Sequence, residues 1–592
     1  MIYYCVQNSR LQKAIQIILL VFLTIISFLY LLDRIMECDF FWHLKTGEWI
    51  WQHKSLPSED PFAYTTPEGY SERKHFILTS YWLSQIIYYL SYLAGGMTGI
   101  IFLRFIVVGL LIFLVLKRKA GDSILYECLL IIFIVFFLTR FSLERPHVYS
   151  FLFFPLILYL LDKIRDEDDS FDEKKKYLFL PLIMILWANM HGGYVLGQAV
   201  IVMYLVTEGL KFTHHSLKPL SKKIYIRLLL AGMLGILFSL ANPNTYHAIN
   251  ILVSKTPATL NSYVIEYQTP FEDFQRGRYE MVLYWLLLVL TAIGMLVNTR
   301  KIDITELTLL AGTGYLSFTT IRYIPFFIIA AIPFIGKSLS KGSILKYVRI
   351  VIIVITIYSA IFFTWDERFN VYNISSNRWL HPSFPVYAAD FIIQNNVKGN
   401  MYNFFDWGGY LIWRLAPERK VFIDGRANYP PILELSNRFI NTADSESFAG
   451  LPYWKAILNT YNVSYIIHSL FDVSGEASPL LFALIQDNDW IPVFSYDRSM
   501  IFLRNSPENY QVLRDYAIPK DHFIDILIGA CDFRIKTNPN DFRPYIARSD
   551  LYMFKGYYDE ARKGYDKALK IAPFNPVLRN RLMIIEKITN TK

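Results

Sequence analysis

The chain has 592 residues, a formal net charge of +9, and 54% hydrophobic against only 18% charged residues. It is too long for one domain, and a soluble protein of this size would carry more charge. Its apolar residues come in runs rather than in amphipathic periods, which excludes an ordinary soluble enzyme and indicates a polytopic membrane protein.

About eleven apolar segments are predicted in the first 365 residues. A signal peptide is disfavoured for the first of them, because no small-residue cleavage site follows it. The predicted spans are Leu11–Leu32, Thr98–Leu116, Ile124–Thr139, His147–Leu161, Tyr177–Met190, Tyr194–Leu210, Tyr225–Ala241, Met281–Val297, Thr305–Thr320, Tyr323–Gly336 and Tyr347–Phe363.

Basic residues fall in alternate loops between these spans, for example Lys174-Lys175-Lys176 and Arg300-Lys301. The positive-inside rule makes those loops cytoplasmic. We therefore expect a multi-pass protein of the cytoplasmic (inner) membrane, with its N-terminus inside and everything after Phe363 outside. The net positive charge is then a topology signal beside membrane lipids and requires no nucleic acid.

The unusual polar motifs all fall on the outer side in this topology, which indicates a site that opens away from the cytoplasm. The loop over residues 33–97 is too long for a connector, and Glu37 and Asp39 follow the first span directly. His43 lies four residues after Asp39, on the same face of a helix. A carboxylate here suits an acceptor hydroxyl that must lose a proton. The alternative is an interfacial helix with an aromatic belt.

Three arginines could hold a phosphate or diphosphate if they face one cavity. These are Arg104, Arg145 and Arg322, although each alone could be an interface anchor or snorkel. Other outer polar residues are candidates for substrate binding, or for packing. They are His147, His191 beside a glycine pair, Asn242 and Glu266.

Residues 366–508 turn polar and predict a small α/β domain. Its expected strands are Tyr402–Phe405, Lys420–Ile423, Val463–His468, Trp490–Tyr496 and Met500–Arg504, with helices at Val386–Asn395 and Tyr453–Tyr461. Polar residues at two strand ends predict either a substrate pocket or a turn with a capped helix. They are Asp406, Trp407, Asp424 and Arg426.

Residues 509–592 change character again. Seven residues stand at tetratricopeptide-repeat spacing, a helix–turn–helix of about 34 residues. They are Tyr545, Tyr552, Gly556, Ala561, Tyr565, Ala568 and Pro573. This region is predicted either to bind a protein partner or to cap the α/β domain. No Walker loop, dinucleotide fingerprint or zinc pair is found, so no nucleotide cofactor is expected, and a divalent metal stays open.

These residues resemble a polytopic glycosyltransferase of the GT-C superfamily, in which an acidic residue follows the first helix and a lipid-linked sugar is the donor. Several motifs are similar to those of a bacterial multispan group that often ends in tetratricopeptide repeats: Asp39-Phe40-Phe41-Trp42-His43-Leu44, Arg145-Pro146-His147, Asn189-Met190-His191-Gly192-Gly193, Asn242-Pro243 and Ile423-Asp424-Gly425-Arg426. The segment Phe404-Phe405-Asp406-Trp407-Gly408 resembles the WWDYG motif of oligosaccharyltransferase catalytic subunits, with Phe at both tryptophan positions and Trp at the tyrosine position.

The resemblance implies a GT-C-like membrane domain over residues 1–365, and a membrane glycosyltransferase with a polyprenyl-phosphate sugar donor. Asp39 would be the general base, aided by Glu37 or His43, and the arginines would hold the departing phosphate. Two rival hypotheses remain. One is a polymerase, ligase or oligosaccharyltransferase-like enzyme that transfers a whole lipid-linked glycan, and the other is a non-enzymatic transport or assembly protein.

Overall fold

The computed structural model describes most of the chain. The described residues are 31–32, 34–118, 138, 141, 143–165, 175–214, 217–253, 265–275, 281–297, 303–339, 380–381, 383–441, 447–448, 450–472, 474–573 and 575–590. The predicted span Tyr347–Phe363, and nearly all of Leu11–Leu32 and Ile124–Thr139, lie outside these residues. The number of eleven spans therefore stays a prediction.

The chain forms two compact units that interleave in sequence. Unit 1 comprises Met1–Glu37, Thr46–Leu56 and Ser71–Asp366, whereas unit 2 comprises Cys38–Lys45, Pro57–Tyr70 and Glu367–Lys592. Two short stretches of the N-terminal region thus belong to the C-terminal unit.

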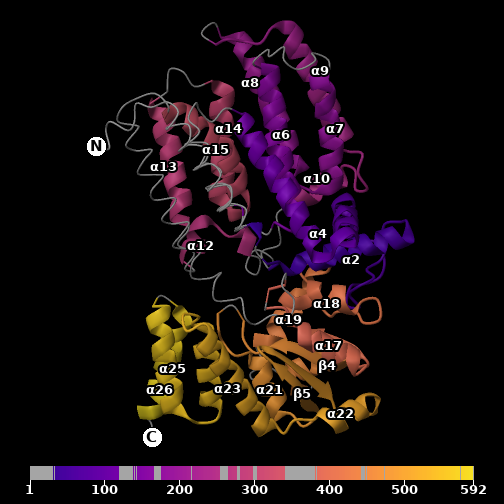
Figure 1. The fold of residues 1–592 in the computed structure, drawn as a ribbon, viewed down its shortest axis with the longest axis vertical. Coiled ribbons are helices and arrows are strands. Elements are labelled where there is room, and N and C mark those ends of the chain that lie inside the picture. The colour runs from indigo at the N-terminus through magenta and orange to yellow at the C-terminus, as the bar shows by residue number, and fades with distance from the viewer. Residues whose placement is uncertain are drawn as a thin grey trace, which may run out of the picture. The chain divides into compact units, whose positions relative to one another are not determined.

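Unit 1 is helical, and its longest helices run side by side (Figure 1). Its helices are α3 (Glu72–Thr79), α4 (Trp82–Lys117), α6 (His147–Arg165), α7 (Lys175–Met190), α8 (Tyr194–Leu210), α9 (Lys222–Phe238), α10 (His247–Val253), α12 (Pro270–Gln275), α13 (Met281–Val297), α14 (Ile304–Thr319) and α15 (Ile324–Leu339), with short 3₁₀ turns η2 (Lys211–Thr213), η3 (Ile265–Tyr267) and η4 (Ile321–Tyr323). The apolar segments predicted in these ranges are therefore helices.

Helices of a length and composition that could cross a membrane occur in the described part of unit 1. They are Glu72–Lys117, His147–Arg165 and Tyr194–Thr213, and three shorter apolar helices accompany them. Within α4 the helix is interrupted at Gly95 and Gly96, where Gly96 has a φ of 58°. The predicted span Thr98–Leu116 is the part after this kink, and the outer loop predicted at 33–97 contains α3, the first part of α4 and α2 (Cys38–His53).

Unit 2 contains a four-stranded sheet in the order β1-β4-β6-β5. The strands are β1 (Asn400–Asn403), β4 (Val463–Ser469), β5 (Trp490–Tyr496) and β6 (Ser499–Arg504), and a two-stranded ribbon joins β2 (Ser447–Phe448) to β3 (Leu451–Pro452). β1 pairs parallel to β4, with Met401 opposite Tyr465, and the other ladders are antiparallel. Buried residues of β1, β4 and β6 form the core, because the sheet is covered on its faces.

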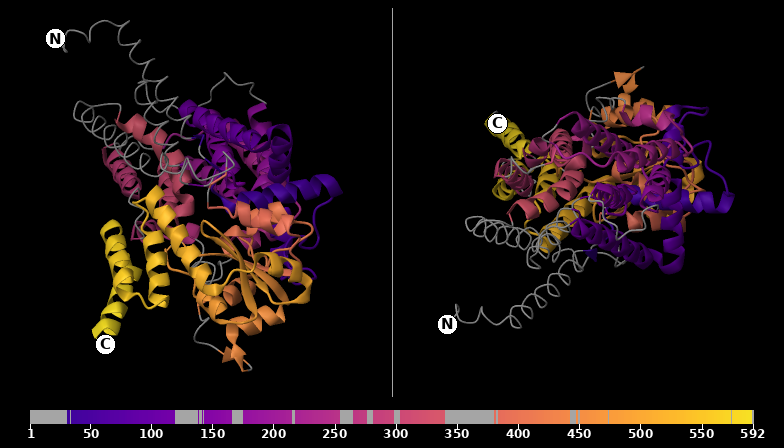
Figure 2. Two further views of the ribbon diagram at one scale, coloured as in Figure 1. Left: turned by 60° about the horizontal axis from the view of Figure 1, so that its bottom comes forward. Right: turned by 90° about the horizontal axis from the view of Figure 1, so that it is seen from above.

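Helices surround this sheet, and the C-terminal helices stand beside it (Figures 1 and 2). They are α17 (Val386–Gln394), α18 (Gly408–Leu415), α19 (Pro430–Asn441), α20 (Tyr453–Thr460), α21 (Pro479–Gln486), α22 (Tyr510–Tyr516), α23 (Lys520–Thr537), α24 (Arg543–Phe554), α25 (Tyr558–Ile571) and α26 (Pro576–Asn590), with 3₁₀ turns η5 (Phe405–Trp407) and η6 (Pro507–Asn509). α24 packs on α25 so closely that a Cβ at Gly564 would overlap Ser549. This is the helix hairpin expected at the repeat-like spacing, although the repeat assignment itself stays a prediction.

The predicted strand Lys420–Ile423 does not join the sheet, and this prediction was wrong. The Asn403 side chain takes its place at the end of β1, since its amide donates to Ile423 O (2.8 Å) and its carbonyl accepts from Phe422 N (2.9 Å). Val421 instead forms an isolated parallel bridge with Ala63. The segment thus pairs with the early segment Pro57–Tyr70, a partner that local sequence cannot reveal.

Candidate functional site

Two arginines of unit 1 lie together at the ends of apolar helices. Arg145, just before α6, forms an ion pair with Glu266 in η3. Arg322, in η4, donates from Nη1 to the Tyr267 hydroxyl (3.3 Å), and its guanidinium lies 5.7 Å from the Tyr267 ring centre. No carboxylate in the described part of the chain pairs with Arg322. The two guanidiniums therefore face one carboxylate, which leaves an excess of positive charge.

His191 lies beside these arginines in a fixed tautomer. Its Nδ1 accepts from the Gly193 N–H (3.0 Å) and lies 2.6 Å from Ser150 Oγ. Ser150 accepts from the Trp187 indole N–H (2.7 Å), so its own proton points to His191. Because Nδ1 is the acceptor, the neutral ring carries its proton on Nε2. A Cβ at residue 193 would overlap Ser150, which explains the glycine.

The charges of the cluster act on its titrating groups. Burial lowers the pKa of His191 well below its usual value, and Arg322 and Arg145 lower it further. Burial raises the pKa of Glu266, but Arg145 and Arg322 lower it by more, so the carboxyl is ionised. His191 is therefore a neutral hydrogen-bond donor within a cationic site. The ring of His147 lies 6.3 Å from that of His191.

The asparagines of the outer motifs hold turns. Asn189 accepts from the Trp82 indole (2.8 Å) and donates to Ala241 O (2.8 Å). Asn242 accepts from Asn244 N (2.9 Å) and donates to Ser239 O (2.8 Å). These bonds fix the ends of α7 and α9, so the structure places Asn242 in a turn that positions its neighbours.

Arg104 pairs with an internal carboxylate. It lies 5% exposed within α4, forms an ion pair with Glu144 and donates to Leu31 O (2.7 Å). Glu144 is also buried, so the pair compensates charges that apolar surroundings would penalise. The structure thus brings Arg145 and Arg322 together, whereas Arg104 is occupied by an internal carboxylate.

Unit 2 contains a second polar cluster, centred on Arg426. Its Nε and Nη2 donate to the two Asp424 oxygens (both 2.7 Å), and its Nη1 donates to Asp60 Oδ1 (2.9 Å). Asn428 donates to Asp60 Oδ2 (2.7 Å). Burial raises the pKa of Asp60, but Arg426 and the Phe62 N–H lower it by more. The predicted substrate ligands Asp424 and Arg426 are therefore a buried clamp between two distant segments.

Asp39 lies against this clamp. At Gly425 an added Cβ would overlap the Asp39 carboxylate, and at Gly409 it would overlap Cys38 O. Glycine is needed at both positions because the start of α2 approaches the backbone so closely. Phe41 anchors the same turn, with its ring 5.0 Å from Phe384. Asp39 is thus held in one position by residues of the α/β domain.

The other predicted catalytic residues lie in or next to α2. His43 is one turn after Asp39, is only 2% exposed, and stacks on Trp42 with ring centres 3.5 Å apart. Glu37 is half-buried and immediately precedes the helix.

The residues of the motif 404–408, at the end of β1, differ in their exposure to solvent. Trp407 is 1% exposed and donates its indole N–H to Ser383 O (2.9 Å), whereas Asp406 is exposed. A Cβ at Gly408 would overlap Ile423 O, so the glycine permits helix α18 to start against the clamp loop. Trp407 therefore lies in the core at the start of α18, which has no side-chain cap, and its proposed role in substrate binding stays a prediction.

Three contributors to the unit 1 cluster were missed by sequence reasoning. Tyr267 and Ser150 have no local signature. Arg73 interacts electrostatically with Tyr81, as Arg322 and Arg145 do. A signal existed for Arg73, since a basic run in a loop assigned to the outer side departs from the positive-inside rule. Within the described residues no group of three His, Cys, Asp or Glu side chains forms a metal site.

No protein-family model matches the chain, and no curated protein matches its sequence. Its structural neighbours include the archaeal oligosaccharyltransferase AglB from Archaeoglobus fulgidus in complex with an inhibitory peptide and a dolichol-phosphate, with a TM-score of 0.44 and 12% identity over 84% of this chain and 75% of that chain. The Archaeoglobus fulgidus oligosaccharyltransferase in complex with Zn and sulfate is similar at a TM-score of 0.45 and 11% identity, over 82% and 73% of the two chains.

Proposed function

We propose that this membrane protein transfers a glycosyl group from a polyprenyl-phosphate sugar to an acceptor hydroxyl outside the cytoplasm. The observation that carries the proposal is the cationic cluster of unit 1. Among the described residues Arg322 there has a tyrosine hydroxyl but no carboxylate as its partner, beside the Arg145–Glu266 pair and a neutral His191.

The charge of this cluster suits a phosphodiester donor. Such a donor has one negative charge, and the arginines of the cluster outnumber the Glu266 carboxylate, so the cluster can balance that charge. When the bond from the sugar to the phosphate oxygen breaks, a second negative charge develops on the leaving phosphate. Arg322 and Arg145 would stabilise that charge, and the His191 Nε2–H would donate a hydrogen bond to it. Arg104 has no part in this proposal, because Glu144 already pairs with it.

The proton of the acceptor is assigned to Asp39. The acceptor oxygen attacks the anomeric carbon, the carbon–oxygen bond to phosphate breaks, and the Asp39 carboxylate takes the hydroxyl proton. The close approach of Gly425 to this carboxylate supports the assignment, since a general base must be held in position. His43, one turn after Asp39 on the same helix, and Glu37, just before that helix, are proposed to support it.

The phosphate site is tested by direct binding of farnesyl phosphate to the full chain in nanodiscs, with farnesol as the uncharged control. Arg322→Ala should weaken farnesyl phosphate binding about 10- to 100-fold, because that is the loss of affinity expected when one charged hydrogen-bond donor is removed. Arg322→Lys should restore it only in part, because lysine lacks the fork. Arg514→Ala, which removes an exposed arginine of unit 2, should change nothing. Equal affinities for phosphate and alcohol would refute the phosphate site.

The base is tested separately by transfer of labelled sugar. Asp39→Asn keeps the side-chain shape but cannot accept a proton, so transfer should fall about 10²–10⁴-fold. Farnesyl phosphate binding should stay at the wild-type value. Near-normal transfer by Asp39→Asn would remove Asp39 as the base.

The proposed orientation is tested by cysteine labelling. Labelling of Ser474→Cys only from the cytoplasmic side would contradict the proposed orientation.

A further inference from the structure

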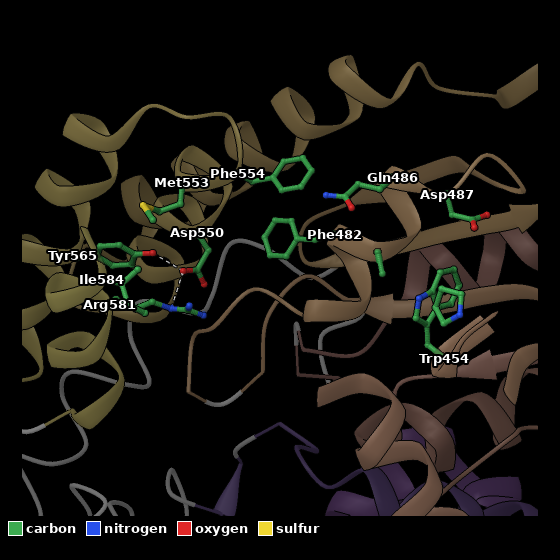
Figure 3. A pocket seen from close by; sticks show the side chains of 12 residues that line it. Trp454, Phe482, Gln486, Asp487, Asp550, Met553, Phe554, Tyr565, Arg581 and Ile584 are labelled. Atoms are coloured by element: carbon green, nitrogen blue, oxygen red, sulfur yellow. Dashed lines mark hydrogen bonds and ion pairs between the residues drawn. The ribbon is translucent and has the colours of Figure 1, made fainter. Parts of the chain in front are cut away.

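A cavity of about 640 Å³ lies within unit 2, between the α/β domain and the C-terminal helices (Figure 3). Helices α20 and α21 line one side, and α24, α25 and α26 line the other. Its volume lies in the range of small-molecule sites. None of its lining residues takes part in the glycosyl-transfer steps proposed above.

One wall of the cavity is aromatic. Phe482 and Phe554 face each other with ring centres 5.0 Å apart and planes inclined by 27°. Figure 3 shows both rings near the middle of the view, with Met553 to their left. Both phenylalanines are only half-buried, so part of each side chain is accessible to a ligand. Flat apolar rings of this kind suit the C–H face of a sugar, which stacks on aromatic side chains.

The other wall is polar, but its charges are already paired. Asp550 accepts from the Tyr565 hydroxyl (2.5 Å) and from Ala477 N (2.9 Å), and lies 3.2 Å from Arg581 Nε. Asp487 lies 2.6 Å from Lys455 Nζ. A charged ligand would therefore have to compete with an internal partner for each group.

Paired charges can still bind neutral hydroxyls, because carboxylate oxygens keep free lone pairs and a guanidinium keeps further N–H groups. Gln486 adds an exposed amide that makes no side-chain hydrogen bond to any described residue, and an amide both donates and accepts. The cavity thus combines an aromatic platform with neutral donors and acceptors. That combination matches a neutral sugar better than an acidic or basic peptide.

We infer that this cavity binds a neutral saccharide, with one ring against Phe482 and Phe554 and its hydroxyls hydrogen-bonded to Gln486 and the Asp550–Arg581 pair. The inference goes beyond the proposed transfer and does not depend on it, because the cavity is built from residues of unit 2 alone.

The test is saccharide binding to the full chain in nanodiscs, measured by saturation-transfer NMR and by calorimetry. The probes are cellotriose, maltotriose and chitotriose, with trialanine as the peptide probe. We expect at least one trisaccharide to bind at millimolar concentration, with saturation transferred mainly to one ring. Phe554→Ala should weaken its binding about fivefold to tenfold, and Gln486→Ala should also weaken it.

The matched control is Phe533→Ala, which removes a 54% exposed phenylalanine of α23 that does not line the cavity, and should leave binding unchanged. Arg322→Ala should also bind saccharide normally, so that a failure of the transfer proposal is distinguishable from a failure of this one. Absence of trisaccharide binding by the wild type, equal binding by Phe554→Ala, or binding of trialanine in preference to all three sugars would overturn the inference.

Discussion

Replacing Arg426 with methionine tests the clamp of unit 2. Methionine retains much of the apolar stem but removes the guanidinium that joins Asp60 to Asp424. The three side chains are 1%, 2% and 5% exposed, so water cannot replace the lost partner without a rearrangement. Two buried carboxylates would be left without compensation.

The expected cost is about 3–5 kcal/mol of unfolding free energy, which is typical when one partner of a buried pair is removed. Adding the separate hydrogen bonds of Arg426 would give a larger value, but such bonds are not additive within one network. For a unit of this size about 2–4 °C accompanies each kcal/mol, so the unfolding temperature should fall by about 6–20 °C. Arg514→Met, at an exposed pair with Asp515, should cost only about 0–1 kcal/mol.

Thermal unfolding in detergent between neutral and acid pH provides the assay. In the wild type the pKa of Asp60 is lowered, so its contribution is present above the ordinary pKa of aspartate and is lost as the pH falls through the lower folded value. In the variant the Asp60 carboxyl takes up a proton more readily, because the Arg426 countercharge that lowers its pKa is gone. The difference in unfolding temperature between the wild type and Arg426→Met should therefore become smaller in acid. A difference no larger than that caused by Arg514→Met, or one that becomes larger in acid, would refute the reasoning.

Three further outcomes are expected. Gly425→Ala should displace the Asp39 carboxylate and lower sugar transfer about 10²-fold, with little change in unfolding temperature. Unchanged transfer would show that the close approach of Gly425 to Asp39 is not needed. Ser150→Ala removes the hydroxyl that fixes His191 and leaves an indole N–H unpaired, so farnesyl phosphate should bind several-fold more weakly and stability should fall by about 1–3 kcal/mol in thermal unfolding. Burial raises the pKa of Asp550 to about 6, so the stability of unit 2 should fall as the pH rises from about 4 to 6, and Asp550→Asn should remove that slope.

The apolar helices were predictable from the sequence because their signal is local. The segment Tyr194–Leu210 was predicted with the bounds that α8 has, and Met281–Val297 with those of α13. Each is a continuous apolar run that ends at polar or basic residues. The strands predicted at Val463–His468 and Trp490–Tyr496 were confirmed. Their signal was also local, because turn residues flank each of them closely.

The candidate site was less predictable because its partners are far apart in sequence. Residue type alone indicated the chemistry of Arg145 and Arg322, but it did not indicate that Glu266 would pair with the first and Tyr267 with the second. Arg426 was predicted to contact substrate, and nothing near it in sequence indicated Asp60, 366 positions earlier, as its partner. Long-range pairing depends on the finished fold, which a local pattern does not contain.

The interleaving of unit 2 has a consequence for the order of biosynthesis. Asp60 leaves the ribosome 366 residues before Arg426, an interval of about 20–70 s at typical rates of translation. During that interval Phe40, Phe41 and Phe62, which are fully covered in the finished protein, have not yet met the residues that bury them. Completion of unit 2 must therefore follow synthesis of the whole of unit 1. The nascent chain meanwhile presents an aromatic surface that a chaperone of the receiving compartment could shield.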